Sequence, residues 1–209
     1  MKQEHYLDSL RPETSEKVKE MEVYAKEYNV PIMEPLGIDF LMQLVRMHSP
    51  KKILEIGAAI GYSAIRMAEA DSDSQIVTVE RDSARYEEAC KNIGEFQLEQ
   101  RVKILHGDAL ELREKIAEDG PYDMLFIDAA KGKYEEFFNL YAPLLTEKGA
   151  IISDNVLFKG YVADDEHATK RMAKIAGKIR TFNEWLANHP DYHTTIVPIG
   201  DGIAITVKK

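Results

Sequence analysis

Three oxygen-bearing side chains follow two apolar runs of the sequence, and their types predict a chemistry. Asp128 comes directly after the run 124–127, and Asp154 and Asn155 follow the run 150–153. Carboxylate and amide oxygens, without His or Cys, suit Mg²⁺, which keeps positions open for water or substrate oxygens. An Asp at a strand end is more often a turn-former than a ligand. Because neighbouring strand residues point to opposite faces, Asp154 and Asn155 share an ion only if the chain leaves strand geometry there.

A second group of residues is typical of a nucleoside site. Gly57 and Gly61 lie where an apolar run passes into helical spacing, and they allow the backbone to approach a ligand. Glu80 ends the next run about 20 residues later, where an acidic side chain accepts hydrogen bonds from ribose hydroxyls. The glycines alone fit helix packing equally well, and Glu80 alone fits a solvated strand end. Their pairing favours a nucleoside-containing cofactor.

A third turn, Gly107-Asp108-Ala109, follows the next apolar run. Asp108 fits a helix cap, and capping does not prevent it from facing an adenine. The chain contains no GxGxxG, GxxxxGK[ST], HExxH or GxSxG motif, and its six histidines have no ligand spacing. These absences argue against a dinucleotide-dependent dehydrogenase, a phosphate-loop enzyme and a serine hydrolase.

The elements that position these residues follow from the apolar pattern. Short apolar runs alternate with stretches of helical period, and runs without polar alternation are typical of strands buried on both faces. The sequence therefore predicts a parallel sheet covered by helices on both sides. The predicted strands are 53–56, 76–79, 102–105, 124–127 and 150–153, with helices around 63–70, 83–96, 109–118 and 134–144.

Both ends of the chain depart from this alternation. Apolar stripes predict two helices, over 12–28 and about 38–47, in an N-terminal helical cap that covers about 1–48. At the other end, strand-like runs at 194–199 and 203–207 are joined by Gly200-Asp201-Gly202, a link that permits only an antiparallel hairpin. We find no repeat and no linker, so residues 1–209 are predicted to form a single domain.

Composition narrows the function classes. Apolar residues make up 44% of the 209 residues and charged residues 30%, which is typical of a folded domain. The net charge of −9 argues against binding polyanions over the whole surface, although it allows a local basic patch. Cys90 is the only cysteine, which fits a reducing compartment. Since Met1–His5 contains no apolar signal core and no run approaches membrane-spanning length, we expect a cytoplasmic protein.

One helical segment carries cations at regular spacing. They are Lys170, Arg171, Lys174, Lys178 and Arg180, while Met172, Ile175, Ile179 and Trp185 form the apolar side of the same pattern. Such a stripe is usually the solvated face of a helix. In an acidic protein it also fits contacts to phosphates.

Together, these residues resemble the class I S-adenosylmethionine-dependent methyltransferases, and among them the cation-dependent O-methyltransferases related to catechol and caffeoyl-CoA methyltransferases. The bacterial tRNA 5-hydroxyuridine methyltransferases are the branch that the chain resembles most. The resemblance extends from about Pro31 to the end. Its motifs, in order, are Leu54-Glu55-Ile56-Gly57, Gly61-Tyr62-Ser63, Gly107-Asp108-Ala109, Phe126-Ile127-Asp128-Ala129-Ala130-Lys131, Asp154-Asn155-Val156-Leu157 and Gly200-Asp201-Gly202-Ile203.

The resemblance implies an α/β, Rossmann-like fold with a seven-stranded, mostly parallel sheet, an antiparallel last strand and helices on both faces. It implies that Asp128, Asp154 and Asn155 hold the metal and that Lys131 acts as the general base. Ala130 departs from the family, because many relatives carry a second Asp there. The residues that the resemblance assigns to the cofactor are Met33, Gly57, Ser63, Glu80, Asp108, Ala109 and Asp128.

The implied reaction is Mg²⁺-dependent methyl transfer from S-adenosylmethionine to the hydroxyl of 5-hydroxyuridine at the wobble position of tRNA, which gives 5-methoxyuridine. The expected partner is the anticodon loop, and the expected assembly is a homodimer. Lys159 and the basic helix at 170–180 favour RNA slightly. A catechol-like small molecule is the alternative acceptor, because both acceptors place two oxygens side by side. From another class, a non-catalytic nucleotide-binding regulator is disfavoured by the presence of Asp128, Lys131, Asp154 and Asn155.

Overall fold

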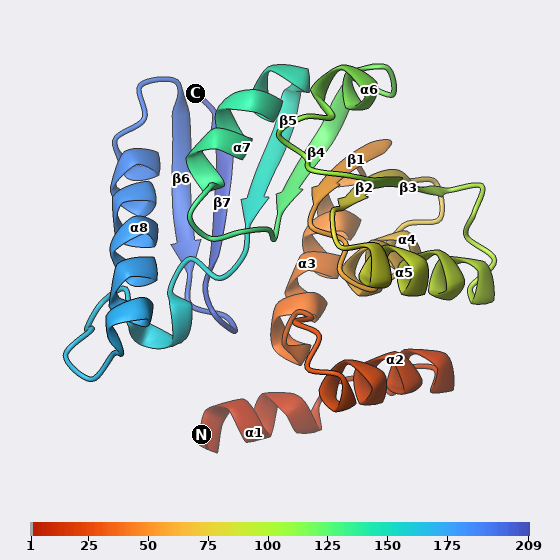
Figure 1. Cartoon of the computed structure of the whole chain (residues 1–209), viewed down its shortest axis with the longest axis horizontal. Coiled ribbons are helices and arrows are strands. Elements are labelled where there is room, and N and C mark those ends of the chain that lie inside the picture. Colours follow the sequence, from red (N-terminus) through yellow and green to blue (C-terminus); the bar gives the residue numbers. More distant parts are fainter. Residues whose placement is uncertain (1) are drawn as a thin grey trace.

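The computed structural model describes residues 2–209, with side chains described from His5 onward, and a seven-stranded sheet runs through it (Figure 1). The strand order is β3-β2-β1-β4-β5-β7-β6, and β7 runs antiparallel to both of its neighbours. The predicted mostly parallel sheet with an antiparallel last strand is therefore confirmed. The strands are β1 (Lys52–Ile56), β2 (Gln75–Glu80), β3 (Val102–His106), β4 (Tyr122–Ile127), β5 (Leu145–Ser153), β6 (Tyr192–Val197) and β7 (Ile203–Lys208).

Helices cover both faces of this sheet because successive strand residues point to opposite sides. Ile53 and Met124 belong to one buried apolar cluster, and their neighbours Leu54 and Leu125 belong to the other. The first cluster includes side chains of α3 (Pro35–His48), α4 (Tyr62–Ala70) and α5 (Ser83–Glu95). The second includes side chains of α6 (Arg113–Ala117), α7 (Tyr134–Tyr141) and α8 (Lys170–Ala187).

The N-terminal helices agree with the predicted stripes, with one addition. Helix α2 (Glu16–Glu27) buries Val18, Met21 and Ala25, and Ser15 caps its first turn. A further helix, α1 (Lys2–Ser9), precedes α2 and was not predicted as an element of its own. Figure 1 shows α1 and α2 on the side toward which the arrows of β4, β5 and β6 point. Met1, the first residue of the predicted cap, lies outside the described residues.

The predicted helix at 109–118 is too long. Helix α6 begins only at Arg113, because Asp108 Oδ1 accepts a hydrogen bond from the Leu110 N–H at 2.9 Å and folds the chain into a turn first. Asp108 thus stabilises a turn and does not cap the helix. The predicted helix at 134–144 ends as an α-helix at Tyr141 and continues as a 3-10 turn, η1 (Ala142–Leu144), and a second such turn, η2, covers Phe158–Gly160.

The strand register sets where the site forms. Ile56 pairs with both Val79 and Ile127, and Ile127 pairs with Ser153. The carboxyl ends of β2, β1, β4 and β5 therefore lie in a row. From β1 the chain adds β2 and β3 on one side of the sheet, and it then crosses over to add β4 and β5 on the other side, so the strand order reverses between β1 and β4. Open α/β sheets bind ligands at such a reversal. Within the described part of the chain, none of the helices is both long enough and apolar enough to cross a membrane.

Candidate active site

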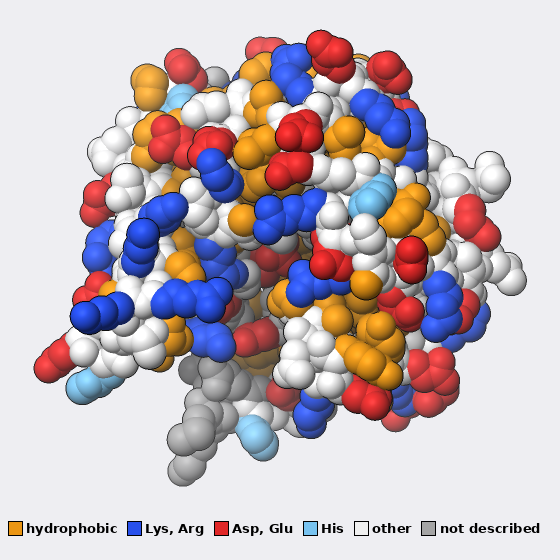
Figure 2. Space-filling model, in the orientation of Figure 1, with side chains coloured by type: hydrophobic (Ala, Val, Ile, Leu, Met, Phe, Trp, Pro, Cys, Tyr) orange, Lys and Arg blue, Asp and Glu red, His pale blue; other side chains and the backbone are white. Residues whose placement is uncertain are grey.

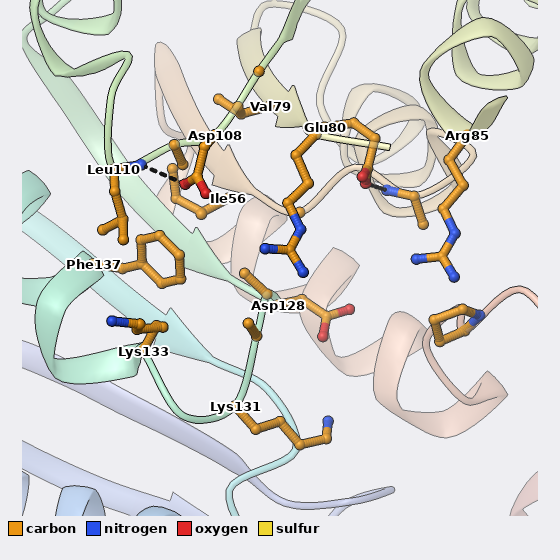
Figure 3. A pocket seen from close by; sticks show the side chains of 18 of the residues that line it. Ile56, Val79, Glu80, Arg85, Asp108, Leu110, Asp128, Lys131, Lys133 and Phe137 are labelled. Atoms are coloured by element: carbon orange, nitrogen blue, oxygen red, sulfur yellow. Dashed lines mark hydrogen bonds between the residues drawn. The ribbon is translucent and has the colours of Figure 1, made fainter. Parts of the chain in front are cut away.

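Two cavities open side by side at the carboxyl edge of the sheet. The first has a volume of about 390 Å³ and is lined by the predicted cofactor residues Gly57, Glu80, Asp108, Ala109 and Asp128 (Figure 3). The second has a volume of about 360 Å³ and is lined by residues that include Asp154, Lys159 and Asp201. Pro31, Asp128, Lys131 and Asn155 line both. A ligand in either cavity would therefore lie beside these four shared residues.

Gly57 occupies a position that other residues cannot take. Its φ is +105°, and an ideal Cβ built on it would lie 2.2 Å from the backbone oxygen of Asp128. Its N–H donates to the Val79 carbonyl at 3.1 Å. The end of β1 is thus held between the ends of β2 and β4, which opens the first cavity beside it.

The Glu80 carboxylate is fixed by two backbone donors. Oε2 accepts from the Ala59 N–H and Oε1 accepts from the Asp82 N–H, each at 2.8 Å, and the residue is 7% exposed. Each carboxylate oxygen has a second acceptor site. Both oxygens can therefore accept one more hydrogen bond from a pair of ligand hydroxyls.

Two predicted cofactor residues lie elsewhere. Met33 lines the second cavity and is buried in the apolar cluster under α3. Ser63 is buried at the start of α4, and its hydroxyl donates to Glu55, which also accepts from the Thr78 hydroxyl. Ser63 is not among the residues that line either cavity. The assignments of Met33 and Ser63 to the cofactor stay predictions.

The predicted metal ligands come from neighbouring strand ends. The Asp154 N–H donates to the Ile127 carbonyl at 3.0 Å, and Asn155 then turns into a left-handed conformation with φ +57°. Asn155 Nδ2 donates to Asp154 Oδ2 at 3.0 Å. The chain therefore leaves strand geometry at Asn155, which is the condition under which the two side chains can face one ion.

Buried charge dominates the electrostatics of this site. Loss of hydration, together with the nearby Asp128 carboxylate, raises the pKa of Asp154 to about 8. Loss of hydration also raises the pKa of Asp128 to about 6, although the Lys131 ammonium opposes the shift. Two carboxylates in so dry a place favour a cation between them.

The donor set fits a hard divalent cation. Over residues 5–209, no group of three or more His, Cys, Asp or Glu side chains is arranged to hold an ion. The set at this site consists of two carboxylates and one amide, without thiolate or imidazole. Softer metals that select thiolate or imidazole are therefore disfavoured at Asp128, Asp154 and Asn155.

Lys131 lies at the boundary of the two cavities. Its ammonium donates to Asn155 Oδ1 and lies 5.8 Å from the centroid of the Phe158 ring. Burial lowers the pKa of Lys131, while the Asp128 and Asp154 carboxylates raise it. A lysine with a lowered pKa can accept a proton more readily than an exposed one.

Several residues that line the cavities were not predicted from the sequence. Arg81 and Arg85 line the first cavity, and Glu34 and Phe158 line the second. Arg81 directly follows Glu80, the last residue of β2, and this position could have predicted that it lies at the cavity. Phe158 gives no such signal, because it reaches the cavity only through the irregular turn after Asn155.

The fold agrees with that of known proteins. A candidate caffeoyl-CoA O-methyltransferase from Staphylococcus aureus has a solved structure with TM-score 0.94 and 37% identity, covering 100% of both chains. An O-methyltransferase from Bacillus cereus, solved in complex with SAH, has TM-score 0.84 and 28% identity over 98% of this chain and 96% of that one. A catechol O-methyltransferase from Niastella koreensis is 35% identical over 81% of this chain and 79% of its own length.

These structures define the fold as that of a Rossmann-like methyltransferase. The model of the family described as O-methyltransferase matches residues 2–209. The chain belongs to this O-methyltransferase family.

The buried Glu55 predicts a pH dependence of stability. Loss of hydration raises its pKa to about 7 from an ordinary value of 4.5. The protonated form is therefore favoured in the folded state, and the stability it contributes is complete below pH 4.5 and lost as pH rises through 7. We expect Glu55→Gln to gain stability relative to the unchanged protein between these limits, by up to about 3 kcal/mol.

Urea unfolding of both proteins at pH 5 and pH 8 measures this difference, and the comparison cancels the titration of Asp128 and Asp154. Glu99→Gln, at an exposed position, is the matched control and should show no such trend. An equal stability difference at both pH values would contradict the assignment.

Proposed function

We propose that this chain is an S-adenosylmethionine-dependent and Mg²⁺-dependent O-methyltransferase that modifies 5-hydroxyuridine in the anticodon loop of tRNA. The observation that carries the proposal is the meeting of the two cavities at Asp128, Lys131 and Asn155. A cofactor in the first cavity would be in contact with an acceptor in the second, as methyl transfer between them requires.

The first cavity supports the choice of cofactor. The related Bacillus cereus O-methyltransferase was solved with SAH, and the Streptomyces achromogenes O-methyltransferase TomG, 27% identical, was solved with SAM. In this chain Glu80 offers two acceptor oxygens to the ribose hydroxyls, and Asp108 and Ala109 would contact the adenine. Gly57 lines this cavity and lets the chain after β1 lie against the backbone of Asp128, because an ideal Cβ there would be 2.2 Å from the Asp128 oxygen.

When bound, S-adenosylmethionine supplies an electrophilic methyl group, and a divalent cation supplies Lewis-acid polarisation of the acceptor oxygens. Asp128, Asp154 and Asn155 would hold the cation. Lys131 Nζ would accept the proton of the acceptor hydroxyl, and the lowering of its pKa by burial supports this role. Phe158 and Lys131 line the second cavity together and limit the access of water.

The surface beside the second cavity supports RNA as the substrate. Lys and Arg side chains gather at the left of the hollowed face, over α8 (Figure 2). Lys170, Arg171, Lys174 and Lys178 are exposed on this helix. An ideal Cβ on Gly132 would lie 2.9 Å from Lys178 Nζ, so this ammonium lies against the loop that carries Lys131. We refer to these four cations as the α8 basic face.

Arg180 is not part of this face, although the sequence grouped it with the others. Its Nε donates to the Val162 carbonyl at 2.9 Å, and its Nη2 forms an ion pair with Asp165 at 3.3 Å. Over residues 5–209, it is the one member of the predicted cluster of five that forms an ion pair. Arg180 therefore holds the loop before α8, and a phosphate contact of this residue stays a prediction.

A small-molecule acceptor is the second candidate. Relatives named as a catechol O-methyltransferase and as a Vitis vinifera flavonoid 3',5'-methyltransferase, which is 32% identical over 95% of this chain, favour it. A catechol and 5-hydroxyuridine both place two oxygens on adjacent ring atoms, so the donor set accepts either. The α8 basic face distinguishes them, because a catechol has no phosphates to contact it. The homodimer implied by the resemblance and the cytoplasmic location expected from the sequence are further parts of this proposal.

The cofactor assignment predicts the effect of a change at Glu80. Glu80→Ala should weaken S-adenosylmethionine binding by about 1 to 3 kcal/mol, because the ribose hydroxyls lose a charged acceptor. Isothermal titration calorimetry measures the change. Glu87→Ala, at an exposed position of α5, is the matched control and should bind normally. Unchanged affinity in the Glu80 variant would count against this role.

The metal assignment predicts that activity disappears with EDTA and returns with Mg²⁺. Asp154→Ala should lose methyl transfer at any Mg²⁺ concentration while it still binds the cofactor, because its carboxylate faces the second cavity. Radiolabelled methyl transfer and calorimetry on the same preparation separate the two effects. Full turnover in the presence of chelator would refute the metal requirement.

The RNA assignment predicts different losses on two substrates. Lys174→Glu/Lys178→Glu should cut methylation of hydroxyuridine-containing tRNA at least tenfold and leave methylation of a catechol within about twofold, because only RNA brings phosphates to the α8 basic face. Binding of tRNA should weaken as salt rises. Lys115→Glu/Lys148→Glu makes the same charge change at other exposed positions and should affect neither reaction. Nucleoside mass spectrometry follows the product.

Equal activities of the Lys174/Lys178 variant on both substrates would mean that these lysines are a solvated face. Methylation of catechols without methylation of tRNA, across a range of salt, would favour the small-molecule alternative.

A further inference from the structure

The turn between β6 and β7 packs against the chain that follows the predicted metal ligands. The Val156 N–H donates to the Gly202 carbonyl at 3.0 Å, and the Leu157 N–H donates to the Asp201 carbonyl at 2.8 Å. The Asp201 side chain adds a third bond, in which Oδ1 accepts from the Lys159 N–H at 2.5 Å. Three backbone donors of one short segment are thus satisfied by two residues of the turn.

The segment held in this way has an unfavourable backbone. Asn155, Phe158 and Lys159 all have positive φ, at 57°, 45° and 55°. Residues other than glycine adopt this region only at a cost in free energy, so the conformation persists only where surrounding contacts determine it. The contacts from the turn help to hold residues 155–159 in this shape, together with the hydrogen bond that Asn183 Nδ2 donates to the Val156 carbonyl at 2.8 Å.

The turn itself has little room to move. An ideal Cβ on Gly202 would lie 2.3 Å from Leu157 Cγ, so the turn and the segment are in direct contact. On its other side, a Cβ on Gly200 would lie 3.5 Å from Glu34 Oε2, in the segment that lines the second cavity. The turn is wedged between the two walls of that cavity, and Asp201 lines it as well.

We propose that Asp201 is a positioning residue of the acceptor site. Its carboxylate holds the Lys159 N–H and thereby fixes the strained segment that presents Asn155, Phe158 and Lys159 to the second cavity. Asp201 acts through the geometry of these residues and does not take part in the transfer. The inference rests on the proposed function in that it assigns the second cavity to the acceptor.

An electrostatic role is the competing explanation, because Asp201 carries a charge near Lys131 and Asp154. Asp201→Asn separates the two. The amide keeps an oxygen that accepts from the Lys159 N–H, but it removes the charge. Asp201→Ala removes both. Asp191→Ala is a matched control, since Asp191 is exposed near the opposite end of the same hairpin.

The first experiment is amide hydrogen exchange followed by mass spectrometry, which needs neither cofactor nor substrate. We expect slow exchange of the Lys159 amide in the unchanged protein, at least tenfold faster exchange over residues 157–161 in Asp201→Ala, and near-normal exchange in Asp201→Asn and Asp191→Ala. Fast exchange at Lys159 in the unchanged protein would overturn the proposal even if Asp201→Ala failed to fold. So would equal losses of protection in the Asn and Ala variants.

The second experiment measures kinetics. Asp201→Ala should raise the acceptor KM and the Mg²⁺ concentration for half-maximal activity at least fivefold, with S-adenosylmethionine affinity unchanged, and Asp201→Asn should restore most of both. Normal acceptor KM in Asp201→Ala would overturn the positioning role. If the unchanged protein methylates no acceptor at all, the proposed function fails, whereas the exchange experiment still tests the contact between Asp201 and Lys159.

Discussion

The site depends on two carboxylates, Asp128 and Asp154, that the parallel register of β4 and β5 brings to adjacent strand ends away from water. Neither is fully charged at neutral pH without help, because burial raises both pKa values. The one ammonium between the cavities, Lys131, cannot neutralise two negative charges. A divalent cation held by Asp128, Asp154 and Asn155 would supply the charge that balances both carboxylates, beside the Lys131 ammonium that donates to Asn155 Oδ1. The proposed metal and the proposed base therefore follow from one electrostatic constraint.

The backbone meets that constraint with unusual conformations at a few positions. Gly57 lies against the Asp128 carbonyl with positive φ, which lets β1 and β4 end side by side. Asn155 turns left-handed directly after Asp154, which aims two consecutive side chains at one place. Such positions cost stability and are typical of binding sites. The contacts of the β6–β7 turn with residues 156–159 offset that cost.

Much of this could be predicted from the sequence, for physical reasons that differ between elements. Uninterrupted apolar runs specify buried strands, so the sheet and the hairpin at Gly200–Gly202 followed directly. The length of α6 did not, because a side chain to backbone hydrogen bond from Asp108 competes with the helix. The contacts of Arg180 could not be predicted for a similar reason: spacing places it among the lysines, but only the fold brings the Val162 carbonyl and Asp165 to it. Long-range contacts of this kind leave no periodic pattern in the sequence from which they could be predicted.

The two halves of the sheet contribute residues to different cavities of the site. Strands β2 and β3 contribute Glu80 and the turn at Asp108 to the first cavity alone, whereas the segment after β5 and the turn before β7 contribute Phe158, Lys159 and Asp201 to the second. Asp128 and Lys131, after the end of β4, line both cavities, whereas Gly57, after the end of β1, lines the first. Changes around β5, β7 and α8 can therefore alter the acceptor without disturbing the cofactor. Relatives named for catechol, flavonoid and caffeoyl-CoA acceptors at 28 to 35% identity fit this division. The α8 basic face belongs to the half of the chain that forms the second cavity, where a preference for RNA would have to be built.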